Sequence, residues 1–157
     1  MKAIIPNLWF DMFAEEAAEF YCSIFPNSKI IDRAYYTEGS PGPAGTVMSV
    51  TFQLNGQEYV GINGGPQFPF TEAVSLAVEC DDQVEIDRYW EQLLAGGGTE
   101  SVCGWLKDKY GFSWQVVPKT WMEYAAGDDP EKVKRAMNAM LKMVKFDIAE
   151  LERAYNG

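Results

Sequence analysis

The chain contains no histidine among its 157 residues. Histidine is the side chain whose ordinary pKa changes its charge near neutral pH, and it is the commonest metal ligand in proteins. No imidazole is therefore available to bind a metal ion, to activate a cysteine or to act as a general base. This absence excludes the most familiar routes to catalysis.

Cysteine is scarce as well, with three residues, Cys22, Cys80 and Cys103, and no CxxC spacing. An odd number without metal-like spacing indicates neither a disulfide framework nor a zinc knuckle, and a reducing cytoplasm fits best. The N-terminus reaches Pro6 before any apolar stretch is long enough for a signal peptide, and no later stretch is long enough to span a bilayer. We expect a cytoplasmic protein without a membrane segment.

Basic residues are also few, 13 against 23 acidic ones, which gives a formal net charge of −10 and a pI near 4.4. Nucleic acid and anionic membranes repel such a chain. The densest basic group, Lys132, Lys134 and Arg135, is most simply the solvated face of a helix. We expect neither nucleic-acid nor membrane partners.

What the sequence does contain is an internal repeat. Residues 8–11, an apolar run that leads into an acidic amphipathic stretch, are echoed without gaps by residues 76–79. Leu8 and Leu76, like Tyr21 and Tyr89, are separated by the same offset of 68 residues. A strand-to-helix unit that recurs at one spacing indicates two copies of a supersecondary unit.

Each copy is predicted to contain a strand, a helix and three further strands. In the first, residues 3–10 read as a strand and 14–25 as a helix with Phe13 on its apolar stripe, followed by strands at 29–36, 48–54 and 58–63. Asn55-Gly56 is the hairpin signal between the last two. The second copy begins at residue 75, has a helix at about 82–94 and ends in a strand at 112–117. Helices close the chain, with the N-caps Asp129 and Asp147.

The predicted fold class is therefore α+β, with paired βαβββ modules and C-terminal helices. We expect one domain over residues 1–157, with repeat one at about 1–65, repeat two at about 73–118 and the helices at about 119–157. A methionine-rich stripe on those helices is either core or dimer interface, or a groove for a partner protein. It is formed by Val133, Met137, Met140, Leu141 and Val144.

With the two units placed, the sequence resembles the PhnB-like branch of the glyoxalase/bleomycin-resistance, or vicinal oxygen chelate, superfamily. The resemblance covers essentially the whole chain. Its motifs are Trp9-Phe10, Ala14-Glu15-Glu16-Ala17, Phe20-Tyr21, Phe25-Pro26-Asn27-Ser28, Asn63-Gly64-Gly65-Pro66, Cys103-Gly104-Trp105-Leu106-Lys107-Asp108 and Gly111-Phe112-Ser113-Trp114-Gln115.

The resemblance implies a curved mixed-sheet cup, often completed by a second subunit, so we expect a homodimer. Metal-using relatives hold the ion in that cup with His and Glu side chains, at positions that carry Asn7, Val60, Ser75 and Gln115 here. These are poor ligands, because hard divalent ions prefer carboxylates and imidazoles. Gln67 stands where relatives often have His. We therefore expect no metal and no other cofactor.

Some relatives are described as demethylubiquinone methyltransferases. The chain has no Gly-rich strand-to-helix turn of the kind that holds a nucleotide-like methyl donor, which argues against that activity.

Strand alternation predicts which side chains share the open face. Asn7, Trp9, Ser75, Ala77 and Glu79 should face the cup, together with Ser113, Gln115 and Val117, while Leu8, Phe10, Leu76, Val78 and Cys80 pack against helices. Such a polar, mildly aromatic cup suits a small molecule that is oriented by hydrogen bonds and one stacking ring.

Each candidate also has a structural interpretation. Trp9 either stacks on a ligand or fills space between sheets, and Asn7, Ser75 and Gln115 either bind a ligand or tie strands together. Asp11 and Glu79 occupy equivalent places in the repeats, so they form a carboxylate pair or cap the following helices. Cys103 is a reactive thiol or a buried apolar residue.

We expect a metal-free, small-molecule-binding protein that sequesters its ligand. Candidate ligand-binding residues are Asn7, Trp9, Ser75, Trp105, Ser113 and Gln115. If the protein is an enzyme, Glu79 or Asp11 assists a proton transfer or addition, while Ser75 and Gln115 polarise an oxygen. The alternatives are a metal-dependent dioxygenase, isomerase or lyase with ligands such as Glu58, Glu79 or Asp11, and a protein-interaction module built on the C-terminal helices.

Overall fold

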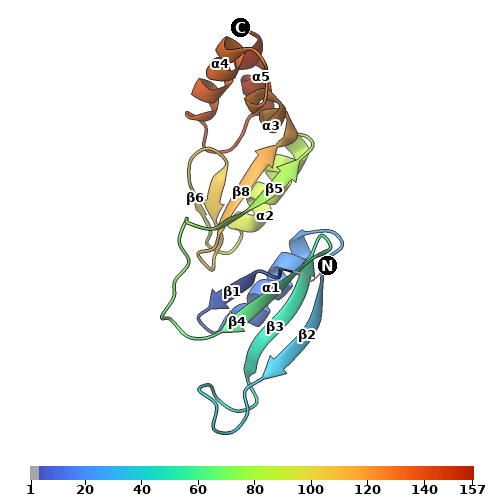
Figure 1. Ribbon diagram of the computed structural model, residues 1–157, viewed down its shortest axis with the longest axis vertical. Coiled ribbons are helices and arrows are strands. Elements are labelled where there is room, and N and C mark those ends of the chain that lie inside the picture. The colour runs from blue at the N-terminus through green and yellow to red at the C-terminus, as the bar shows by residue number, and fades with distance from the viewer. Residues whose placement is uncertain (1–3) are drawn as a thin grey trace. The chain divides into compact units, whose positions relative to one another are not determined.

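A computed structural model describes residues 4–157. The chain forms two compact units, the first ending at Phe70 and the second running from Thr71 to Gly157. Figure 1 traces both from the N-terminal to the C-terminal end. No helix among the described residues is long and apolar enough to cross a membrane.

The first unit is a four-stranded mixed sheet with one helix. Its elements are β1 (Asn7–Phe10), α1 (Ala14–Ile24), β2 (Lys29–Tyr35), β3 (Val47–Leu54) and β4 (Gln57–Asn63). The strand order is β1-β4-β3-β2, with β1 parallel to β4 and the other pairs antiparallel. The predicted Asn55-Gly56 hairpin joins β3 to β4 with φ of 46° and 87°, as a type I′ turn requires.

The second unit repeats this plan and adds three helices. Its repeat consists of β5 (Ser75–Cys80), α2 (Gln83–Leu94), β6 (Thr99–Glu100), β7 (Trp105–Lys107) and β8 (Ser113–Pro118). The strand order β5-β8-β7-β6 corresponds position by position to that of the first sheet, again with one parallel pair, β5 and β8. The α+β class and the two βαβββ modules predicted from the sequence are confirmed.

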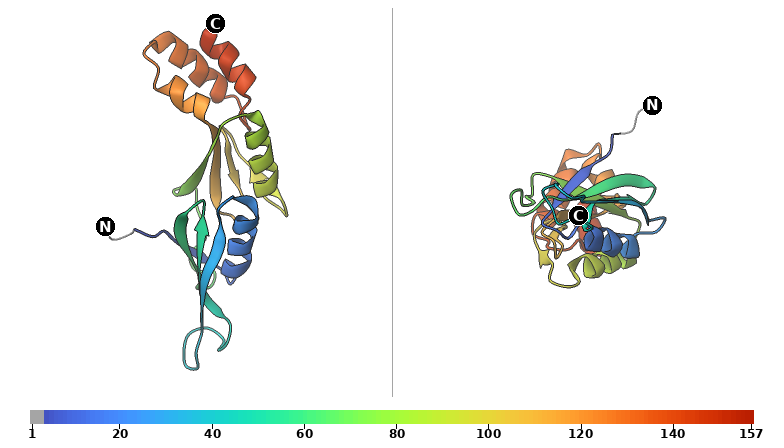
Figure 2. Two further views of the ribbon diagram at one scale, coloured as in Figure 1. Left: turned by 90° about the vertical axis from the view of Figure 1, so that its right-hand side faces the viewer. Right: turned by 90° about the horizontal axis from the view of Figure 1, so that it is seen from below.

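In each unit the helix covers one face of its own sheet (Figure 2). Helix α1 buries small residues and one ring, Ala14, Ala17, Ala18 and Tyr21. Gly61 on β4 permits this close approach, because a Cβ there would lie 3.1 Å from the Ala14 methyl group. The expected inward position of Phe13 is wrong: it precedes the helix and is 51% exposed.

Helix α2 packs as its apolar spacing predicts. Ile86, Tyr89, Trp90 and Leu93 are buried. They belong to the core on the helix-covered face of the second sheet, which also includes Cys80, Leu106, Trp114 and Val116. The opposite face of each sheet is therefore the one left for polar side chains.

The C-terminal helices are α3 (Lys119–Ala125), α4 (Pro130–Met140) and α5 (Ile148–Asn156). Asp129 and Asp147 are the N-caps of α4 and α5, as predicted, and their carboxylates accept backbone N–H bonds. Arg135 of α4 donates to the carbonyl oxygens of Ala154 and Tyr155, at 3.0 and 2.8 Å, so it joins α4 to the last turn of α5.

Candidate functional site

The candidate site lies on the face of the second sheet opposite α2. Strand register sets its two rows, because residues paired across a sheet share a face. One row contains Ser75, Ser113 and Lys107, and the next contains Ala77, Gln115 and Trp105. The strand β5 thus joins the neighbouring strands β7 and β8, and together they hold four of the six predicted ligand-binding residues.

Ser75 and Gln115 are linked directly. The Gln115 Nε2 group donates to Ser75 Oγ at 2.8 Å, and both residues are half-buried. The amide oxygen of Gln115 and the hydroxyl hydrogen of Ser75 remain as hydrogen-bonding groups for a partner. The pair therefore combines an acceptor and a donor.

Ser113 differs from its neighbours because it is fully buried and its hydroxyl has no hydrogen-bond partner among the described residues. A buried polar atom without a partner costs about 1–3 kcal/mol. Ser113 is part of the wall of a cavity of about 180 Å³. The other lining residues are Glu72, Thr99, Glu100, Ser101, Trp105, Leu106 and Lys107.

Two carboxylates line this cavity, and each interacts with another side chain. Glu72 Oε1 lies 2.6 Å from Lys107 Nζ. The hydrogen bond from Lys107, helped by a backbone N–H, lowers the pKa of Glu72. Glu100 Oε1 accepts a hydrogen bond of 2.9 Å from the Trp90 indole on α2.

The predicted ligand-binding residues of the first unit, Asn7 and Trp9, both make hydrogen bonds within the protein. Trp9 donates its indole N–H to the Gly65 carbonyl at 2.8 Å and meets the Phe68 ring edge-on at 5.1 Å. Gly64 lies against the indole, where a Cβ would approach within 2.0 Å of the ring. Asn7, paired in register with Val60, is exposed and donates to the Ile5 carbonyl at 2.9 Å.

The interpretation of Asp11 and Glu79 as caps of the following helices is wrong. Both side chains are exposed, and α2 is capped by Asp82, whose carboxylate accepts from the Glu85 N–H. At α1 the N-cap position is Phe13, which makes no side-chain cap bond, and Asn63 Oδ1 from the end of β4 accepts the Ala14 N–H at 2.8 Å. Sequence reasoning missed this cap because its partner lies 49 residues away.

Cys103 belongs to a loop that binds the C-terminal segment. Its N–H donates to the Met143 carbonyl at 2.8 Å, and the Gly104 N–H donates to Val144 at 2.7 Å. Gly104 has φ of 79°, and a Cβ there would lie 2.6 Å from the Phe146 ring. The Cys103 thiol is free and half-buried.

A polar contact fixes the same segment to α2. Gln83 donates to the Phe146 carbonyl and accepts from the Ile148 N–H, both at 3.0 Å. Lys145 Nζ lies 2.6 Å from Asp87, which lowers the pKa of that carboxyl. The C-terminal helices are thus an integral part of the second unit.

Residues 4–157 include no group of three or more His, Cys, Asp or Glu side chains placed to hold a metal ion. Asp11 and Glu58 belong to the first unit and Glu79 belongs to the second. Neither unit by itself therefore assembles this alternative set of metal ligands.

Residues 2–117 match the model of a protein family described as 3-demethylubiquinone-9 3-methyltransferase. The solved PhnB protein of Bacillus cereus is 40% identical over 74% of this chain and 99% of that chain, with a TM-score of 0.67. The chain belongs to the PhnB-like family of the glyoxalase/bleomycin-resistance superfamily. No curated protein matches the sequence.

Two more distant solved structures share the fold. Protein PA1353 of Pseudomonas aeruginosa is 20% identical over 75% of this chain and 98% of that chain, with a TM-score of 0.61. The fosfomycin resistance protein FosX of Listeria monocytogenes, complexed with Mn(II) and sulfate, is 14% identical over 74% of this chain and 89% of that chain, with a TM-score of 0.53. The family match ends at residue 117, so helices α3–α5 lie outside it.

Proposed function

We propose that this PhnB-like protein binds a small organic molecule on the open face of its second sheet, uses no metal ion to do so, and sequesters the ligand rather than converting it. The observation that carries the proposal is the hydrogen bond between Gln115 and Ser75. By the family resemblance these are two positions at which metal-using relatives place ligands. Here they form a neutral pair that can hydrogen-bond directly to a ligand. The pair offers no negatively charged oxygen to a divalent cation.

The same face offers little for acid–base chemistry. Glu79 is the one carboxylate that β5, β7 and β8 contribute, and it is exposed. A general base is most effective when its pKa lies near the operating pH, which burial or a charged neighbour usually achieves. If turnover does occur, Glu79 or Asp11 would move the proton while Ser75 and Gln115 polarise an oxygen.

The matched family's description raises methyl transfer as another function. One common way to hold a nucleotide-like methyl donor is a Gly-rich turn between a strand and a helix, where backbone N–H groups approach the ligand closely. Residues 11–13 join β1 to α1, and residues 81–82 join β5 to α2, without a glycine in either connection. These connections favour simple ligand binding over methyl transfer.

A fragment screen by ¹⁵N NMR tests the proposed site. We expect Gln115→Ala and Trp105→Ala to weaken bound fragments at least tenfold without loss of fold. Gln57→Ala is the matched control, because within residues 4–157 its amide donates only to the neighbouring Glu58 carbonyl. Fragments that bind equally well to Gln115→Ala, or one bound Zn, Mn, Fe or Ni per chain by elemental analysis, would overturn the proposal.

We also propose that the protein is a homodimer in the cytoplasm, where its three free cysteines stay reduced. The exposed apolar side chains of the methionine-rich stripe favour association: Met137 is 37% exposed, Leu141 59% and Val144 42%. Light scattering of the wild type and of Leu141→Lys, with Asn138→Lys as control, tests this. A monomeric wild type would refute it, and an unaffected dimer in Leu141→Lys would exclude the stripe.

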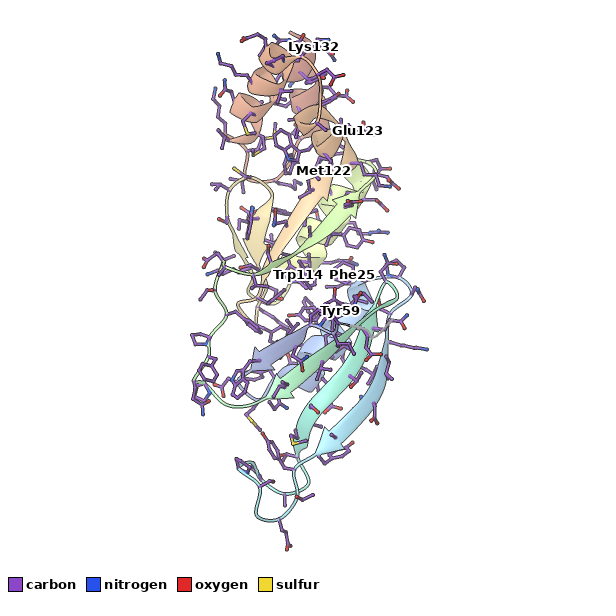
Figure 3. All side chains as sticks on the ribbon, viewed as in Figure 1. Phe25, Tyr59, Trp114, Met122, Glu123 and Lys132 are labelled. Carbon is purple, nitrogen blue, oxygen red and sulfur yellow. The ribbon has the colours of Figure 1, made fainter. Side chains whose placement is uncertain are left out.

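The same exposed stripe is the observation that favours the second candidate function, a protein-interaction module. Figure 3 shows other side chains of these helices, Met122 and Glu123 on α3 and Lys132 on α4. If the protein is monomeric, this function requires a purified partner protein that binds the wild type and Asn138→Lys but does not bind Leu141→Lys.

A further inference from the structure

We propose that Lys107 and Ser113 form the seat of a small carboxylate, and that Glu72 of the same chain occupies the cationic half of this seat when no ligand is bound. The inference rests on the proposed function, since it names the ligand class of the same sheet face. It predicts that one end of the physiological ligand is a carboxylate group.

The strand register provides the geometry. Lys107 on β7 and Ser113 on β8 are directly paired in an antiparallel ladder, so their side chains leave the sheet on the same face. Side chains at such paired positions have Cβ atoms about 4.5–5.5 Å apart. A carboxylate has two oxygens, and this spacing lets one accept from an ammonium group and the other from a hydroxyl group.

The buried hydroxyl is the observation that points to a missing partner. Ser113 Oγ is shielded from solvent and is the one buried side-chain polar atom of the described residues without a hydrogen-bond partner. A serine hydroxyl can donate to neutral and to anionic acceptors, and an anionic acceptor makes the stronger hydrogen bond. The adjacent Lys107 favours the anion.

Glu72 shows which anion the cation accepts. Its carboxylate lies 2.6 Å from Lys107 Nζ, although Glu72 belongs to the connection before β5 and its side chain is 64% exposed. An exposed ion pair of this kind contributes little to stability and exchanges readily. Ser113 Oγ is closed to solvent in the unliganded protein, so a ligand carboxylate reaches it only when the side chains over it move. A carboxylate that displaced Glu72 and reached Ser113 would gain a second hydrogen bond that Glu72 lacks.

The cavity limits the ligand's size. Its volume of about 180 Å³ is below the usual 300–1,000 Å³ of drug-sized pockets. Trp105, from the neighbouring row, provides an apolar wall. The other carboxylate in the wall, Glu100, is held by the Trp90 indole, and it disfavours ligands with several negative charges. A monocarboxylate with a short apolar body fits these walls.

Titration of the ¹⁵N-labelled protein with acetate and with its neutral isostere acetamide, at pH 7, tests the inference. We expect acetate to shift the amide signals of Lys107 and Ser113 saturably, and acetamide to bind at least tenfold more weakly. Glu72→Ala should tighten acetate binding about two- to fivefold, the gain expected from removing a competing exposed ion pair. In that background, Ser113→Ala should weaken acetate about tenfold.

Asp81→Ala is the matched control, because Asp81 forms the equivalent exposed pair with Lys119. It frees a lysine that has no unpaired buried hydroxyl beside it, so acetate shifts at Lys107 and Ser113 should match the wild type. Ser113→Ala removes an unpaired hydroxyl, and its melting temperature should not fall, which keeps the variant interpretable.

Several results would overturn the inference: equal binding of acetate and acetamide, no tightening in Glu72→Ala, or no loss in Ser113→Ala. With fragments still bound at Gln115 and Trp105, these results would leave the proposed function standing. Fragments that bind equally well to the wild type and to Gln115→Ala, together with intact acetate binding at Lys107 and Ser113, would instead refute the proposed function alone.

Discussion

The cap that Asn63 provides for helix α1 gives the sharpest test of the first unit. Asn63 is 4% exposed, accepts the Ala14 N–H at 2.8 Å and donates to the Val47 carbonyl at 2.9 Å. One side chain thereby joins the start of α1, the end of β4 and the start of β3. Replacing it should loosen all three.

The structure sets the expected magnitude for Asn63→Ala. Ala14 is fully buried, so water cannot replace the lost acceptor at its N–H group. A buried group left without its hydrogen bond costs about 1–3 kcal/mol, and both the Ala14 N–H and the Val47 carbonyl lose a partner. We therefore expect the free energy of unfolding to fall by about 2–6 kcal/mol.

Urea unfolding followed by circular dichroism measures this loss, and hydrogen exchange at the Ala14 amide localises it. Asn63→Asp keeps the acceptor but loses the donor, so it should retain protection at Ala14 while still destabilising the protein. Asp11→Ala is the control, since its exposed side chain does not cap the helix and should change stability by less than about 0.5 kcal/mol. Equal losses in Asp11→Ala and Asn63→Ala would refute the reasoning.

Three further outcomes are expected. Gly104→Ala places a Cβ 2.6 Å from the Phe146 ring in a left-handed backbone, so it should destabilise the protein by more than about 1 kcal/mol and speed proteolysis beyond residue 118; unchanged proteolysis would contradict this. Burial raises the pKa of Cys80 to about 12, so its thiol should react with Ellman's reagent at pH 8 only after unfolding, and rapid labelling of the folded protein would be inconsistent with that pKa. Lys145→Gln should raise the lowered pKa of Asp87 in an NMR titration. The stability that this ion pair contributes should be present above about pH 4 and lost as the pH falls through the lowered pKa. An unchanged Asp87 pKa in the variant would show that the pair is not formed.

The elements predicted correctly are those fixed by neighbours in the sequence. Alternation placed Leu8 and Phe10 on the helix-covered face of β1. Asn55-Gly56 specified the hairpin between β3 and β4, because both residues tolerate positive φ. The constant offset between the repeats predicted two copies of one βαβββ unit, and the two sheets do share one strand order. The alternation and the hairpin signal act over a few residues, where backbone geometry restricts the alternatives, and the repeat only applies the same local signals a second time.

The missed α1 cap and the missed Gln83 contacts share another property, which is a partner far along the chain. The α1 cap comes from 49 residues away, and the Gln83 contacts with the C-terminal segment from 63 and 65 residues away. A motif gives no sign of which distant amide will satisfy a buried N–H group. Asp11 has the right chemistry for a cap at the right distance in sequence, and the fold uses Asn63 instead.

The candidate site combines both kinds of information. Local alternation predicted that Ser75, Ser113 and Gln115 share a face, because side-chain direction repeats every two residues in a strand. Only the three-dimensional register shows that Gln115 bonds to Ser75 while Ser113 stays unpaired opposite Lys107. Residue types thus indicate that a polar face exists, whereas the pattern of satisfied and unsatisfied hydrogen bonds indicates where on that face a ligand is still needed.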